Sequence, residues 1–199
     1  MQSTSAIVLA GGESRRLGRD KCTLSIEGQT LLARTITVLA SLADDLLVVS
    51  NDPYRTADLG FPVRLVPDLQ PGVGALMGLY SGLKAARHDR AVTVACDMPF
   101  LSLPLLRYMV GLAADFDVVL PRLGDLVEPL HAVYGQGCLG PMERHLALGR
   151  RRIVVFFDDV RVRYVEQPEI DRYDPRHLSF LNVNTPQDWQ RAQSLLAEI

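Results

Sequence analysis

Cysteine is scarce in this sequence, and no two cysteines have the spacing of a metal or redox motif. Three occur among 199 residues, at positions 22, 96 and 138. Because none forms a C-x-x-C pair, neither a zinc cage nor a redox motif is indicated. An odd and sparse count is typical of a reducing compartment. We expect each cysteine to be a small buried hydrophobe, with Cys96 inside a strand.

Signals for secretion, membrane insertion and nucleic-acid binding are also missing. The first five residues carry no basic cluster, and no apolar run approaches the 18 residues of a membrane span. The net charge of -2 provides no global field for nucleic acid. The four histidines have no metal spacing, and no Ser/His/Asp or Cys/His order suggests nucleophilic hydrolysis. We expect a cytoplasmic protein with neither nucleic-acid nor membrane partners.

The segment with the clearest functional signal is an apolar run, residues 6–10, followed by the loop Gly11–Lys21, which contains glycines, arginines and a lysine. The run is typical of a buried parallel strand. Backbone N–H groups in such a turn, backed by basic side chains, favour a phosphate group. It is not a P-loop, because Gly18 is not followed by Lys and Ser or Thr, and G-x-G-x-x-G is absent. The alternative is an ordinary turn with solvated basic residues.

Strand-like and helix-like segments alternate along the chain. This rhythm predicts one α/β domain with right-handed crossovers, in which helices cover both faces of a mostly parallel, Rossmann-like sheet in three layers. The expected strands are residues 6–10, 46–50, 63–66, 91–96, 117–120, 128–134 and 160–165. The expected helices are residues 30–43, 54–58, 75–86, 103–114, 137–148 and one that begins at Pro186 after Thr185 as its N-cap.

Polar residues follow several expected strands, where open parallel sheets bind ligands. Asn51 follows one strand, and Asp97 follows an uncharged one. A carboxylate at that point suits Mg²⁺, although Asp97 could instead close a turn or cap the next helix. Asp68 lies in a Pro/Gly-rich loop, where simple turn chemistry is the alternative. The run Arg150–Arg152 is either a solvated face or an anion site.

Five motifs together resemble the molybdenum cofactor guanylyltransferases, the MobA family. The first motif alone is shared by many nucleotidyltransferases, whereas the full set, in family order over nearly the whole chain, is specific. The matching segments are LAGG-x-S-x-RLG-x-DK at 9–21, PD with G-x-GAL-x-G at 67–78, DMPF at 97–100, EPL with Tyr at 128–134 and NVNTP at 182–186.

The resemblance implies a GT-A-like nucleotidyltransferase over residues 1–199, with a nucleotide-binding half up to about residue 100 and an acceptor-binding half from about 101. It implies transfer of GMP from GTP to the terminal phosphate of molybdopterin or Mo-molybdopterin, with Mg²⁺ as cofactor and release of pyrophosphate. The product is the guanine dinucleotide cofactor. Transient contact with molybdoenzyme-maturation proteins also follows from the resemblance.

The same resemblance assigns roles to individual positions. Lys21 and Arg16 would hold the triphosphate, and Asp97 would hold Mg²⁺; these three are the expected catalytic residues. Asn182 and Asn184 would bind the acceptor. The expected nucleotide-binding residues are Leu9, Ala10, Gly11, Gly12, Lys21, Asn51, Asp68 and Asp97.

Three positions depart from the family motifs: Leu17 stands for Met, Ala75 for Pro and Glu128 for Gln. The last adds charge near the expected acceptor side.

The alternatives to a guanylyltransferase are a cytidylyltransferase acting on the same pterin, a sugar-phosphate nucleotidyltransferase, or a non-catalytic nucleotide-binding protein. Gly12 favours the guanylyl enzyme, and the presence of both Lys21 and Asp97 argues against a non-catalytic protein.

Overall fold

A computed structural model describes residues 3–11, 21–57 and 59–196, and in this part of the chain eight strands form one sheet. The strand order is β10-β7-β9-β6-β1-β4-β5, with β8 on β7. All neighbours are parallel except β9, which runs against both β6 and β7, and β8, which runs against β7. The strands are β1 (Ser5–Leu9), β4 (Asp45–Val49), β5 (Val63–Val66), β6 (Arg90–Ala95), β7 (Val118–Leu123), β8 (Leu126–Val127), β9 (His131–Gly135) and β10 (Val162–Glu166); β2 (Ser25–Ile26) and β3 (Gln29–Thr30) form a separate hairpin.

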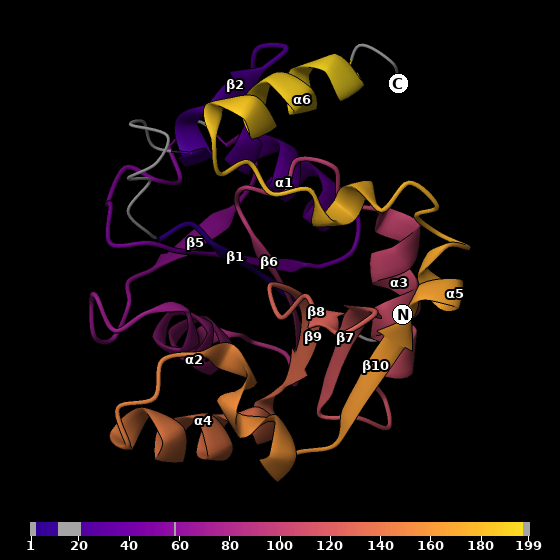
Figure 1. Ribbon diagram of the computed structural model, residues 1–199. Helices are drawn as coiled ribbons and strands as arrows, with labels where there is room; N and C mark the ends of the chain where they lie inside the picture. The colour runs from indigo at the N-terminus through magenta and orange to yellow at the C-terminus, as the bar shows by residue number, and fades with distance from the viewer. Residues whose placement is uncertain (1–2, 12–20, 58, 197–199) are drawn as a thin grey trace.

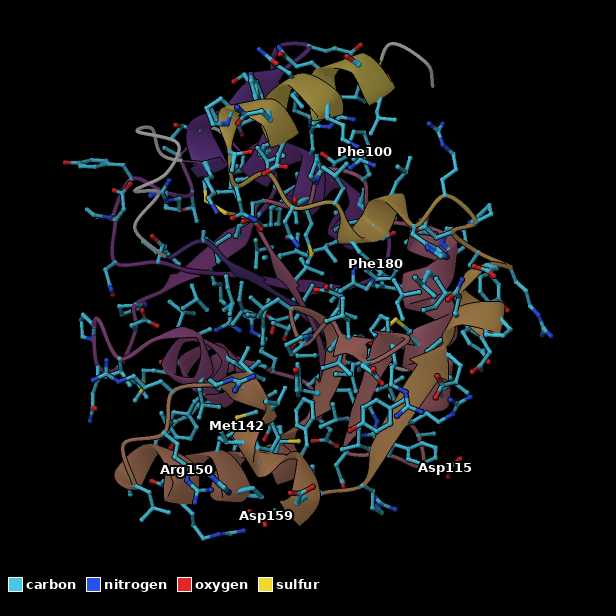
Figure 2. The ribbon with its side chains drawn as sticks, viewed as in Figure 1. Phe100, Asp115, Met142, Arg150, Asp159 and Phe180 are labelled. Atoms are coloured by element: carbon cyan, nitrogen blue, oxygen red, sulfur yellow. A yellow bond between two sulfur atoms is a disulfide. The ribbon has the colours of Figure 1, made fainter. Side chains whose placement is uncertain are left out.

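Helices cover both faces of this sheet (Figure 1). One face packs against α2 and α4, and the other against α1, α3 and α5. Figure 2 labels Met142 on α4 and Phe180 on the opposite side of the sheet. The three-layer, mostly parallel architecture predicted from the sequence is therefore confirmed. The α-helices are α1 (Leu31–Ala40), α2 (Ala75–Ala85), α3 (Leu103–Leu112), α4 (Leu139–Ala147), α5 (Gln167–Ile170) and α6 (Pro186–Leu196), and short 3₁₀ helices span Lys21–Thr23, Gln136–Cys138, Ile153–Asp159 and Leu178–Phe180.

The expected helix starts are confirmed by their capping bonds. The Thr30 hydroxyl accepts a hydrogen bond from the N–H of Ala33 at the start of α1. At α6, Thr185 and Asp188 bond reciprocally, each side chain accepting from the other's N–H. These bonds satisfy N–H groups that lack a partner inside the helix. Among the described helices, none is both long enough and apolar enough to span a membrane.

Two expectations about secondary structure were wrong. The described part of the expected helix 54–58, residues 54–57, forms only turns, because the side chain and carbonyl of Asp52 take the N–H groups of Tyr54 and Arg55. The expected strand 128–134 begins only at His131, since the N–H of His131 closes a turn onto the carbonyl of Glu128. That strand is also antiparallel to β6, which places Glu128 at the carboxyl edge of the parallel strands.

Gly82 lets α2 approach the sheet closely, which leads to a stability prediction. A Cβ atom there would lie 2.7 Å from Cγ2 of Ile7 and 2.9 Å from Cγ2 of Val49, both buried in the sheet. We expect Gly82→Ala to lower the free energy of unfolding by about 1–3 kcal/mol, because overpacking exceeds the helical gain from alanine. Urea denaturation measures this change.

Gly111 in α3 provides the matched control. It is exposed, and a Cβ atom there would meet nothing within 4 Å. We expect Gly111→Ala to leave stability unchanged or to raise it by roughly 0.5–1 kcal/mol. An unaltered urea midpoint for Gly82→Ala would show that α2 is free to move away from the sheet.

The imidazole ring of His131 is buried in the core. Its side chain is 0% exposed, and in the described part of the chain neither ring nitrogen has a partner. The ring lies edge-on to Phe180, with 5.2 Å between ring centroids. Burial lowers the pKa of His131 from 6.5 to about 4, against a smaller opposing effect of Asp174. The histidine is therefore neutral in the folded protein at neutral pH.

This burial predicts a loss of stability in mild acid. Between pH 6.5 and about 4 the unfolded chain binds a proton that folded His131 does not, so stability falls as the pH falls through this range. We expect a loss of about 3 kcal/mol from this group. His131→Leu should remove that loss, whereas His88→Gln, at a histidine paired with exposed Asp44, should keep it. Parallel acid dependence in wild type and His131→Leu would contradict the assignment.

Candidate active site

A cleft of about 980 Å³ opens at the carboxyl edge of the parallel strands. Leu9 is in register with Val49 on one side and Ala95 on the other, so β1, β4 and β6 end at the same level. The residues that follow these strands therefore share one edge, where α/β sheets bind ligands. The expected site residues that line the cleft are Leu9, Ala10, Gly11, Lys21, Asn51, Asp68, Asp97 and Asn182.

Lys21 and Asp97 meet in this cleft. The Lys21 Nζ lies 3.0 Å from Oδ2 of Asp97, with the side chains 21% and 15% exposed. The same Nζ donates a hydrogen bond to Oδ1 of Asn184. A cation near the surface of a cleft, facing a carboxylate, can be redirected to an anionic ligand at modest cost.

Asp97 is anchored through its backbone, and one of its carboxylate oxygens has no donor among the described residues. Its carbonyl accepts a hydrogen bond of 2.9 Å from the N–H of Val183, which fixes the segment containing both asparagines beside it. Its Oδ1 is buried and has no hydrogen-bond partner among the described residues. A buried carboxylate oxygen without a donor is costly unless a ligand satisfies it. Oxygen ligands of this kind are those that a hard divalent cation takes.

Asp68 and Asn51 both line the cleft. The side-chain carbonyl of Asn51 accepts a hydrogen bond of 3.0 Å from the N–H of Asp68. Burial raises the pKa of the Asp68 carboxyl, and hydrogen bonding of that carboxyl to the Asn51 side chain opposes the rise. The Asp68 Oδ1 would lie 3.3 Å from a Cβ atom at Gly78. Glycine at 78 therefore leaves room for this carboxylate, whose Oδ1 is buried and has no hydrogen-bond partner among the described residues.

The start of α2 also lines the cleft. Gly72 and Gly74 have φ values of +80° and +118°, which only glycine adopts without strain. Gly74 is the N-cap and provides no capping side chain, although the N–H of Leu76 bonds to the carbonyl of Arg151. The positive end of the helix dipole faces the cleft, which favours anions. The side chains of Arg150–Arg152 are exposed, and none of these three residues lines the cleft.

Glu128 and Asn182 also line the cleft. Burial raises the pKa of Glu128, and the charge of Asp97 raises it further. Asn182 donates to the carbonyl of Phe180 at 3.4 Å and lines the cleft, whereas Asn184 contacts Lys21. The two asparagines that we expected to act together therefore occupy different parts of the site.

Cys22 and Cys96 are joined by a disulfide, drawn as a yellow bond in Figure 2. Both side chains are buried, with exposures of 4% and 7%, so the burial expected for Cys96 is confirmed. The disulfide itself was not predicted from the sequence, where the sparse count suggested a reducing compartment. Sequence spacing carried no signal for it, because the partners are 74 residues apart and meet only when β6 lies beside β1. Cys138 is free and buried, as expected.

Two expected residues, Gly12 and Arg16, lie outside the described part of the chain. Arg55 was not among the expected site residues, although it lines the cleft and pairs with Asp52 at 3.4 Å. The sequence signal that could have pointed to Arg55 was the strand break Asn51-Asp52-Pro53, which comes shortly before it and follows a buried strand. Within the described residues, no group of three or more His, Cys, Asp or Glu side chains could by itself hold a metal ion.

Comparison with known proteins identifies the family. Residues 6–162 match the model of the MobA-like NTP transferase domain, which is most of the chain and includes β1, β6 and every cleft-lining residue except Asn182. This chain belongs to the MobA-like NTP transferase family. It is thus a nucleotidyltransferase.

Individual relatives agree with the assignment to the MobA-like NTP transferase family. A molybdenum cofactor guanylyltransferase of Desulfosudis oleivorans is 36% identical over 98% of this chain and 97% of its own length. A probable molybdenum cofactor guanylyltransferase of Chloroflexus aggregans is 40% identical over 96% and 94%. The crystal structure of molybdopterin-guanine dinucleotide biosynthesis protein A of Archaeoglobus fulgidus is 28% identical, covers 98% of this chain and 100% of that one, and has a TM-score of 0.84.

Proposed function

We propose that this protein transfers GMP from GTP to the terminal phosphate of molybdopterin or Mo-molybdopterin, forming the guanine dinucleotide cofactor. The observation that carries the proposal is the meeting of Lys21 with Asp97 and Asn184 at the cleft edge. One cation and two oxygen-bearing side chains thus converge from three distant parts of the sequence. The names of the full-length relatives supply the substrate class.

The residues present fit a divalent cation, which we propose to be Mg²⁺. Asp97 offers a buried carboxylate oxygen without a donor among the described residues, and the Oδ1 of Asn184 lies beside the same lysine. Mg²⁺ binds through one or two such oxygens together with phosphate oxygens, so a larger protein cage is not required. When bound, the ion would supply neutralising charge for the departing pyrophosphate.

The proposed reaction needs alignment more than acid–base chemistry. An oxygen of the acceptor phosphate forms a bond to the α-phosphorus of GTP, and the bond from that phosphorus to the bridging oxygen of the β-phosphate breaks. The attacking oxygen is already anionic, so no general base has to remove a proton. Lys21 and the N-terminus of α2 would hold the triphosphate, and Arg16 would assist. The backbone of Leu9–Gly12, Asp68 and Asn51 would position guanine and ribose.

The acceptor is proposed to lie along Glu128 and Asn182, which line the cleft. Amide groups of Asn182 can donate and accept hydrogen bonds, as a polar pterin requires. Asn184 remains a proposed acceptor residue, although its contact with Lys21 also places it next to the triphosphate. Transient contact with maturation proteins and a cytoplasmic location remain predictions from the sequence.

Turnover of the four nucleoside triphosphates with purified molybdopterin tests this function. We expect GTP to be preferred, because backbone groups at Gly11–Gly12 can read the guanine edge. A wrong base would leave polar groups unpaired at about 1–3 kcal/mol each. Pyrophosphate release measured at fixed Mg²⁺ gives the rates. Faster turnover with CTP would establish the cytidylyl alternative, and nucleotide binding without pyrophosphate release would establish a non-catalytic protein.

A further inference from the structure

The Cys22–Cys96 disulfide directly adjoins both charged residues of the site. Cys22 follows Lys21 in the sequence, and Cys96 precedes Asp97. The Cα atoms of the two cysteines are 5.8 Å apart, and both side chains belong to the core under the cleft. One covalent bond therefore links the backbone that carries the site's lysine to the backbone that carries its carboxylate.

The two sides of this bond are anchored differently. Cys96 continues β6, and its N–H donates to the carbonyl of Leu9 at 3.1 Å, so Asp97 is fixed to the central sheet. Cys22 lies in the short 3₁₀ helix Lys21–Thr23, which is outside the sheet. The disulfide thus ties a short helical turn to the rigid end of β6. Lys21 is therefore held beside Asp97 by this covalent link in addition to its own ion pair with the carboxylate.

We propose that the Cys22–Cys96 disulfide is a redox-sensitive positioning bond. It holds Lys21 at its place beside Asp97 and thereby sets the affinity for the triphosphate. The inference rests on the proposed function. A dithiol opens the bond by transferring two electrons and two protons to it, which yields two cysteine thiols and the cyclic disulfide of the reductant. The freed turn then holds Lys21 less firmly against the cleft. Misplacement of a catalytic group by about 1 Å can cost a hundredfold in rate.

The experiment compares oxidised and dithiothreitol-treated protein. Thiol titration in denaturant should rise from one group to three on reduction, because the chain has three cysteines and one of them, Cys138, is free. Fluorescent GTP titrations in Mg²⁺ should then show about tenfold weaker binding of the reduced form. The circular dichroism spectrum and thermal melting confirm that the reduced form is folded.

Variants separate positioning from general stabilisation. The double variant Cys22→Ser/Cys96→Ser should bind GTP weakly with or without reductant. The matched control is Cys138→Ala, which removes the remaining cysteine. Burial raises the pKa of the Cys138 thiol to about 12, so it stays protonated and unreactive in the folded protein. This control should keep the full response to reductant.

Each outcome decides the proposal. Three thiols before reduction would show that the bond does not form in solution and would overturn the inference. Equal GTP affinity of the two forms, with the thiol count changed, would show a purely structural bond and overturn it as well. If neither form binds GTP, the proposed function itself fails and takes this inference with it. The inference is supported if reduction weakens GTP binding of the wild type and does not change the already weak binding of the double variant.

Discussion

Asp97→Asn is expected to reduce guanylyl transfer by at least about a thousandfold, or ~4 kcal/mol of transition-state stabilisation. The substitution is nearly isosteric, so the hydrogen bond from Val183 to the backbone carbonyl should survive. What it removes is the negative charge and one oxygen of a carboxylate whose Oδ1 is buried without a partner among the described residues, and both suit a divalent cation. The rate should therefore recover only partly as the Mg²⁺ concentration is raised.

Asp125→Asn is the matched control for this prediction. Asp125 lies exposed in the turn between β7 and β8 and does not line the cleft. Its replacement should leave both the rate and its Mg²⁺ dependence unchanged. Binding of Mn²⁺ to the nucleotide-free protein, followed by electron paramagnetic resonance, provides a readout independent of turnover. If Asp97→Asn is well folded and turns over normally at low Mg²⁺, Asp97 is only a turn residue and the mechanism is wrong.

Lys21→Ala is expected to weaken GTP binding by roughly ten- to a hundredfold, since a hydrogen bond from a charged donor is worth about 1.5–3 kcal/mol. Transfer should slow further, because charge on the triphosphate increases as pyrophosphate departs. The variant also removes the Lys21 ammonium, which in the wild type lies 3.0 Å from the Asp97 carboxylate. Binding of GTP in the presence and absence of Mg²⁺ measures the effect.

The chain offers one natural comparison, because Lys84 is its only other lysine. Lys84 lies over the ring of Tyr80 on α2, with 5.3 Å from Nζ to the ring centroid, and does not line the cleft. Lys84→Ala should bind GTP as the wild type does. Equal losses of affinity in the two variants would show that a general reduction of positive charge, and not the position of Lys21, explains the result.

The edge of the sheet that forms the site could be predicted from the sequence. Uninterrupted apolar runs identified β1, β4 and β6, and the rule that ligands lie beyond the carboxyl ends of parallel strands then placed Lys21, Asn51 and Asp97 together. This worked because burial of a central strand on both faces leaves a strong and local pattern in the sequence.

Other features depend on contacts that no local pattern encodes. The direction of β9 is set by its neighbours β6 and β7, and the pairing of Cys22 with Cys96 by the meeting of segments 74 residues apart. Asn182 and Asn184 are two residues apart in the sequence, yet one lines the cleft and the other bonds to Lys21. Their separation follows from the backbone bond between Val183 and Asp97, which fixes the residue between them.

The reversed direction of β9 has a consequence for how such an enzyme can diversify. Because β9 runs against β6 and starts where that strand ends, the corner at Glu128–Leu130 lies at the cleft and is attached to β6 through the bond from the N–H of Ala95 to the carbonyl of Leu130. Side-chain exchanges in that corner would therefore alter the lining of the cleft while β1, β4 and β6 keep their pairing. Under the function proposed above, grafting this corner between related transferases would be a compact route to new acceptor specificity.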